Sequence, residues 1–170
     1  MQAHGPFQYQ VDEDLVVEAM RRHMLRRLTG GFVGKLFILV LALLVLLLVL
    51  DLALYGRLSV TSIAFVVAIP SALLMINLWL VPRLARRQFR QSAALRAPST
   101  IAWDGELIHL ACDRGESRIP IAELYRWDRT DRAILLYQTE MMFNPVPKAA
   151  LGEAADRLIA RIEEAGVKRN

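Results

Sequence analysis

Catalytic and metal sites are most often built from histidine, cysteine and carboxylate side chains, and in this sequence those residues are dispersed. His4, His23 and His109 lie far apart and beside no cysteine or carboxylate cluster with the spacing of zinc ligands. Cys112 is the single cysteine, so the chain cannot form an intramolecular disulfide. The spacing therefore predicts no metal site.

Two other motifs that carry chemistry are also missing from the sequence. The glycines from Gly30 to Gly34 lead into an apolar run and lack the spacing of a nucleotide-binding loop. The serines Ser92, Ser99 and Ser117 have no flanking pair of glycines, as a nucleophile elbow requires. We therefore expect no catalytic residue and no cofactor, and a protein that is not an enzyme.

Basic residues are concentrated beside the apolar part of the chain. The net charge is +4, but from residue 100 onward ten basic residues face twelve acidic ones. Five basic residues precede Leu36, and five more lie between Arg83 and Arg96 without any acid. A folded region with a slightly negative balance is a poor match for a phosphate backbone, so nucleic acid is excluded as a partner.

The apolar excess of the chain predicts two membrane spans. Hydrophobic residues make up 55% of the 170, and the excess lies between Leu36 and Val81. We expect a transmembrane hairpin over residues 35–82, with spans at about 36–55 and 61–82 and a kink at Pro70. Basic residues precede the first span and follow the second. Both termini are therefore expected in the cytoplasm of a multi-pass inner-membrane protein.

Asp51 is the one ionisable residue in the first span. Its position near Tyr55 places it close to the outer end of the helix, where interfacial water or Arg57 lies within reach. Asn77 is expected near the opposite end of the second span. A structural role for Asp51 is the simpler interpretation; the alternative is a proton or ion role.

The segment 1–34 is expected to form a short strand at residues 7–11 and a basic amphipathic helix. Asp12 or Asp14 can cap this helix, in which Val17, Met20, Met24 and Leu28 recur at helical spacing. The helix either packs on the cytoplasmic domain or lies in the anionic surface of the inner leaflet. Together with a basic juxtamembrane helix at 83–98, it supplies the candidate membrane-surface contacts: Arg21, Arg22, Arg26, Arg27, Lys35, Arg83, Arg86, Arg87 and Arg90.

Residues 99–170 show the pattern of a small α+β domain. Alternating apolar residues and turn residues predict five or so antiparallel strands, the last two at 133–137 and 141–143. A helix from about Ala149 to Ala165 follows, with Leu151, Ala155, Leu158 and Ile162 in one apolar stripe. About 70 residues make a marginal core, so the strand at residues 7–11 or the basic N-terminal helix is an obvious supplement to it.

The two adjacent spans, the basic exit helix and the segments WDGELIHL, RIPIAELYRW, AILLY and FNPVPKAAL resemble the YcxB-like family of bacterial membrane proteins. The resemblance implies a pleckstrin-homology-like (PH-like) domain, with a bent antiparallel sheet capped by a C-terminal helix. It implies no activity and no functional residues.

Three arginines around one expected hairpin, Arg126, Arg129 and Arg132, could bind a lipid phosphate or an acidic partner. Asp128 and Asp131 are interleaved with them, so a solvated turn with surface ion pairs is the simpler interpretation.

These patterns favour a non-enzymatic inner-membrane protein whose PH-like domain contacts a protein partner or the anionic inner leaflet of the lipid bilayer. The alternative is a small oligomeric transport or channel component in which hairpins associate as a homo-oligomer around Asp51.

Overall fold

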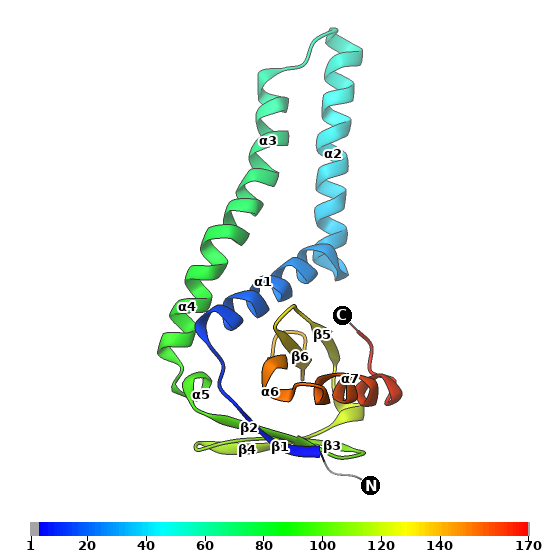
Figure 1. Cartoon of the computed structure of the whole chain (residues 1–170). Helices are drawn as coiled ribbons and strands as arrows, with labels where there is room; N and C mark the ends of the chain where they lie inside the picture. The colour runs from blue at the N-terminus through cyan, green and yellow to red at the C-terminus, as the bar shows by residue number, and fades with distance from the viewer. Residues whose placement is uncertain (1–3, 170) are drawn as a thin grey trace. The chain divides into compact units, whose positions relative to one another are not determined.

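The computed structural model describes residues 4–169, except for the side chains of residues 28, 29 and 31–33. The chain divides into two compact units (Figure 1). The domain unit comprises Met1–Ala19 and Ala85–Asn170, and the helical unit comprises Met20–Leu84. Each unit is described by itself.

Two helices are long and apolar enough to cross a membrane, Gly34–Tyr55 and Val60–Gln91. The first lies in α2 (Gly31–Tyr55). The second comprises α3 (Val60–Met75), the π-helical turn η1 (Ile76–Leu80) and α4 (Val81–Gln91), whose residues from Ala85 onward belong to the domain unit. Their Leu, Val, Ile and Phe side chains are largely exposed, as expected of helices that meet hydrocarbon rather than a protein core. The two expected spans fall within these helices.

Glycine ends the first apolar helix. Gly56 adopts a left-handed conformation with φ 63°, and its N–H donates to the carbonyl of Leu52. This C-cap satisfies one of the last carbonyls of α2 and reverses the chain toward α3.

The second apolar helix departs from α geometry just before Pro82. The α3 helix continues through Pro70, whereas the N–H of Val81 donates to the carbonyl of Ile76, five residues back, in the π turn. Pro82 has no N–H, so the carbonyl of Leu78 lacks its usual helical donor. The departure from α geometry thus lies beside Pro82 and not at Pro70, where a kink was expected.

Two antiparallel sheets form the core of the domain unit. The first has the strand order β1-β2-β3-β4 and the second the order β5-β6-β7. Their bounds are β1 His4–Tyr9, β2 Ser99–Trp103, β3 Leu107–Cys112, β4 Gly115–Pro120, β5 Arg126–Arg129, β6 Ala133–Tyr137 and β7 Phe143–Pro147.

The N-terminal strand joins the sheet of the C-terminal domain (Figure 1). In β1, Phe7 pairs with Ile101 and Tyr9 with Ser99 of β2. The ring of Phe7 stacks on Trp103 at a centroid distance of 5.4 Å. The sequence alone left this pairing open, and it adds a strand and an aromatic contact to a small core.

The C-terminal helix is interrupted once. The expected continuous helix consists of α6 (Lys148–Leu151) and α7 (Ala154–Glu164), separated by Gly152 at φ 54°. The expected apolar stripe is buried, because Leu158 and Ile162 have no exposed surface and pack in one core with residues of both sheets.

Helix α1 (Glu13–Thr29) begins after Asp12, whose carboxylate accepts the N–H of Leu15 at 2.6 Å. Its first turns belong to the domain unit and bury Leu15, Val16, Val17 and Ala19. The first turns of α1 therefore pack in the domain unit. Packing on the domain was one of the two expected alternatives. Leu28 lies outside the described side chains.

One strand boundary differs from expectation. Met141 lies in the turn before β7, which begins at Phe143, and Met141 and Met142 are 63% and 55% exposed. The turn is held by the N–H of Gln138 donating to the carbonyl of Met142. After β4, Ile121 lies in a short 3₁₀ turn, Ile121–Glu123.

Candidate functional site

The basic side chains of α4 are exposed, and two of them pair with acids of α1. Arg86 lies 3.5 Å from Asp14, and Arg90 lies 3.6 Å from Glu13. Arg87 is exposed as well. Exposed ion pairs of this kind contribute about 0–1 kcal/mol each, so these arginines remain accessible to an anionic surface.

Two further basic residues contact the π turn of the helical unit. Arg21 donates from Nη2 to the carbonyl of Leu78 at 3.2 Å, the carbonyl that Pro82 leaves without its helical donor. The guanidinium of Arg83 lies 3.6 Å from the ring centroid of Trp79 in a cation–π contact. The other expected membrane-surface residues, Arg22, Arg26, Arg27 and Lys35, are partly or largely exposed.

The three arginines near the β5–β6 hairpin do not form one open patch. Arg132 forms an ion pair with Asp12, and its backbone N–H donates to Glu18 at 3.3 Å. The guanidinium of Arg126 lies 5.1 Å from the ring centroid of Tyr125, and Arg129 is exposed. Arg132 therefore fastens the start of α1 to the hairpin.

The expectation of a solvated turn is wrong for Asp128, which is buried. Its side chain has no exposed surface, and its carboxylate accepts the backbone N–H of Arg129 at 2.8 Å. Its neighbour Trp127, which points to the other face of β5, is buried as well, so both faces of the strand are covered there. The pattern of charges alone did not reveal this.

Asp51 is held by the start of α3. Its Oδ2 accepts the hydroxyl of Ser62 at 2.6 Å and the N–H of Ser59 at 3.2 Å. Ser59 in turn caps α3 by accepting the N–H of Ser62 at 3.1 Å. These contacts tie the end of α2 to the start of α3, a structural role of the kind expected, although through the serines rather than through Arg57.

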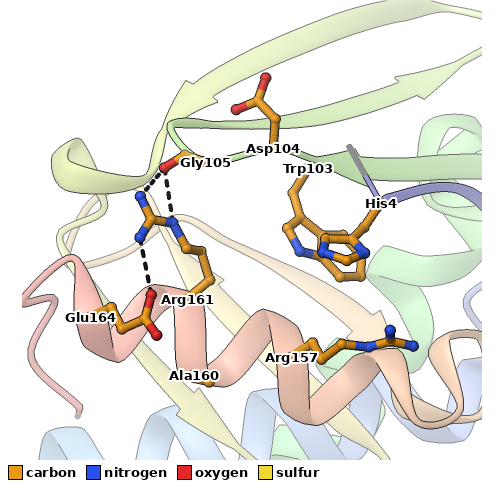
Figure 2. Close-up of a pocket in the computed structure, with 8 residues that line it drawn as sticks. All are labelled: His4, Trp103, Asp104, Gly105, Arg157, Ala160, Arg161 and Glu164. Carbon is orange, nitrogen blue, oxygen red and sulfur yellow. Dashed lines mark hydrogen bonds and ion pairs between the residues drawn. The ribbon is translucent and has the colours of Figure 1, made fainter. Parts of the chain in front are cut away.

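A cleft in the domain unit brings together residues that the sequence analysis did not associate. It has a volume of about 510 Å³ and lies between the β2–β3 turn and the outer face of α7 (Figure 2). Its lining residues are His4, Trp103, Asp104, Gly105, Arg157, Ala160, Arg161 and Glu164.

One end of the cleft is closed by a latch between α7 and the turn. Arg161 donates from Nε to the carbonyl of Gly105 at 2.9 Å and makes a second bond to it from Nη2. Its Nη1 donates to Glu164 at 3.0 Å (Figure 2). These bonds join α7 to the β2–β3 turn and engage the Nε, Nη1 and Nη2 atoms of Arg161.

The Asp104 carboxylate organises the β2–β3 turn beside the cleft. Its Oδ1 accepts the N–H groups of Glu106 and Leu107, both at 2.8 Å. These bonds lower the pKa of Asp104 below 3.8, and His109 at 3.9 Å acts in the same direction. Asp104 is therefore ionised at neutral pH and is engaged by the turn.

The opposite end of the cleft presents hydrogen-bond donors. The ring of His4 lies 5.4 Å from that of Trp103, with an angle of 32° between their planes, and Arg157 extends beneath them from α7 (Figure 2). Among residues 4–169, neither the guanidinium of Arg157 nor the indole N–H of Trp103 has a hydrogen-bond partner. The sequence alone did not associate Arg157 or His4 with this part of the domain.

A second cavity of about 530 Å³ lies elsewhere in the domain unit. Tyr9, Leu110, Cys112, Met142 and Phe143 are among its lining residues. Burial raises the pKa of Tyr9 to about 12, and the neighbouring Cys112 adds to this shift. The Tyr9 side chain that lines this cavity is therefore uncharged at neutral pH.

Comparison with known proteins identifies one segment of the chain. Residues 103–160, from the end of β2 into α7, match the family model described as YcxB-like protein. This match confirms the resemblance for that segment. No curated protein matches the chain, and no solved structure matches it.

Proposed function

We propose that this protein is a non-enzymatic inner-membrane protein that presents a PH-like domain at the cytoplasmic surface for contact with another protein or with the membrane surface. In this proposal the role of the protein is to hold a binding domain at the membrane surface.

One observation carries the proposal: the helix Val60–Gln91 begins as an exposed apolar helix and ends with the arginines of α4. Water is a poor solvent for the first part, since each exposed Leu or Ile side chain favours a hydrocarbon environment by roughly 0.3–0.6 kcal/mol. The basic end favours an anionic surface. Such a helix supports anchoring in a bilayer with the basic end on the cytoplasmic side.

The domain unit supports a PH-like assignment through its architecture. Two antiparallel sheets and the C-terminal helix α7 share one core, and the family match covers this region. The domain is small, and an interaction domain of this size needs no catalytic constellation to act.

Anchoring makes weak contacts sufficient. A domain held within reach of the membrane meets partners there at a high effective concentration, in the millimolar range for short connections. Exposed Met141 and Met142 offer adaptable apolar contact surface for such a partner.

Photo-crosslinking in native membranes tests the proposal. A photoreactive amino acid replaces Met141 in the full chain, and Glu153, an exposed residue on the loop between α6 and α7, serves as the matched control position. We expect a discrete crosslinked protein or lipid from position 141 that is weaker from position 153. Absence of any crosslink above the control at 141 and at further exposed positions of the domain would contradict the proposal.

A further inference from the structure

The two sheets end in the strands β1, β4, β5 and β7, and the edges of β1, β5 and β7 carry features that oppose pairing with another chain. β1 contains Pro6, and β7 contains Pro145 and Pro147, none of which has an N–H to donate. At β5, the N–H of Trp127 already donates to the carbonyl of Lys168. Prolines and covering segments are common means by which proteins prevent association at sheet edges.

The first four residues of β4 form an open edge. They are exposed, and within residues 4–169 no strand other than β3 pairs with them. The turn between the two strands closes on Cys112 and Gly115, so the backbone groups of Gly115 and Ser117 are directed toward β3. The N–H and C=O groups of Glu116 and Arg118 therefore point away from the sheet, where another strand can bind them.

The charges of this edge are complementary to those of a second copy. Glu116 and Arg118 lie two residues apart on one face of β4 and carry opposite charges. When a second β4 pairs antiparallel with Ser117 at the two-fold axis, Glu116 of each copy lies opposite Arg118 of the other. The same register joins the outward N–H and C=O groups of both residues. Registers centred on Glu116 or on Arg118 place like charges opposite each other.

We propose that β4 is a self-association edge, through which two copies of this chain join their four-stranded sheets into one continuous sheet. The backbone groups select an extended strand as the partner, and the charges select a second β4. One short strand makes a small interface, so we expect a weak dimer that forms at high local concentration. The edge lies in the domain unit, so the pairing does not depend on whether the helices enter a membrane.

Disulfide trapping in the full-length chain tests the register. With Cys112 replaced by serine, Ser117→Cys places one cysteine from each copy at the two-fold axis. The Cα atoms of such a pair, which is not hydrogen-bonded, are about 4.5 Å apart, within the range of about 4.4–6.8 Å that a disulfide spans. In detergent micelles with copper phenanthroline as the oxidant, we expect a disulfide-linked dimer on a non-reducing gel.

Arg114→Cys in the same Cys112→Ser background is the matched control. Position 114 is exposed in the turn before β4, but the proposed register separates its two copies by about 20 Å, at about 3.4 Å per residue. Because a disulfide cannot bridge this distance, dimers should form at least about tenfold more slowly than from Ser117→Cys. No dimer from Ser117→Cys, or equal rates at both positions, would overturn the proposal.

Charge reversal separates specific pairing from random collision. In the Ser117→Cys background, either Glu116→Arg or Arg118→Glu places like charges opposite each other on both sides of the two-fold axis, so trapping should slow about fivefold or more. Glu116→Arg combined with Arg118→Glu restores opposite charges and should recover the rate of the Ser117→Cys background. A double variant as slow as the single ones, or single variants that trap at the unaltered rate, would overturn the proposal.

Discussion

Single polar residues act in this protein by satisfying backbone groups at chain reversals. Asp104 accepts two N–H groups in the β2–β3 turn, and Asp51 accepts the N–H of Ser59 and the hydroxyl of Ser62 between α2 and α3. Turns and helix starts leave such donors without a partner, so one carboxylate at each place orders the local chain. These structural roles explain why a carboxylate stands at both positions.

Asp51→Asn separates this structural role from an ion-conducting one. Asparagine keeps an acceptor oxygen for Ser62 but loses the charge, so we expect the variant to keep its membrane integration and abundance while the hairpin unfolds at a somewhat lower denaturant concentration. The measurement is denaturant unfolding in micelles, together with proton flux into liposomes. A proton flux in the wild-type protein that disappears in Asp51→Asn would contradict the structural account.

Asp104 predicts an acid-sensitive turn. Its pKa is lower in the folded chain than the ordinary 3.8, so its contribution to stability is present above that value and is lost as the pH falls through the folded pKa. Asp104→Asn should flatten the fall in domain stability below about pH 4 relative to wild type. The check is thermal unfolding across this pH range, and identical profiles for the two proteins would refute the assignment.

The cleft residues could not have been associated from sequence. His4, Trp103 and Arg157 belong to β1, β2 and α7, and only the pairing of β1 with β2 and the packing of α7 bring them together. Long-range pairing of this kind leaves no local periodicity to detect. Asp104-Gly105, in contrast, was recognisable as a turn because its signal is local.

At the level of elements, the apolar helices and most strands were predictable, and the exceptions have identifiable causes. Runs of apolar residues and turn residues specify the helical hairpin and the strands. The π turn was not predicted from the sequence. It arises because Pro82 has no N–H to donate to the carbonyl of Leu78 in the preceding turn. The boundary at Met141 was wrong because exposed methionines imitate an apolar strand.

The β1 strand depends on the absence of a side chain at Gly5. Its φ is +105°, and an added Cβ would lie 2.8 Å from the carbonyl oxygen of Ile101. Gly5→Ala should therefore loosen β1 from β2 and lower domain stability by about 1–3 kcal/mol. Hydrogen exchange of the β2 amides provides the readout.

Gly115→Ala is the matched control for this prediction. Gly115 also has a positive φ, but an added Cβ would meet nothing within 4 Å. Exchange in β2 should stay at the wild-type rate in this variant. Equal effects of both substitutions on β2 would show that close approach at Gly5 is unimportant.

Arg21 and Pro82 are predicted to be energetically coupled. In the wild-type chain Arg21→Ala leaves the Leu78 carbonyl without a donor and should cost on the order of 1 kcal/mol of hairpin stability. In a Pro82→Ala background the restored N–H can serve that carbonyl, so the cost should be smaller. A double-mutant cycle in micelles measures the coupling, and additive effects would rule it out.

On the scale of the whole molecule, the chain consists of an apolar helical pair and a domain with its own core. The core cluster of the domain unit contains residues of β2–β7 and α7. The large apolar side chains of α2 and α3 are mostly exposed, and such a surface favours an apolar environment. This separation supports a chain in which anchoring and binding are carried by different parts.

Labelling of introduced cysteines tests the membrane hairpin most directly. With Cys112 replaced by serine, single cysteines are placed at Arg57, in the loop between α2 and α3, and at Glu163 on the exposed face of α7. In intact cells a membrane-impermeant maleimide should modify the cysteine at position 57, and the one at position 163 only after permeabilisation. Equal labelling of both positions, or recovery of the chain in the soluble fraction without detergent, would contradict the account.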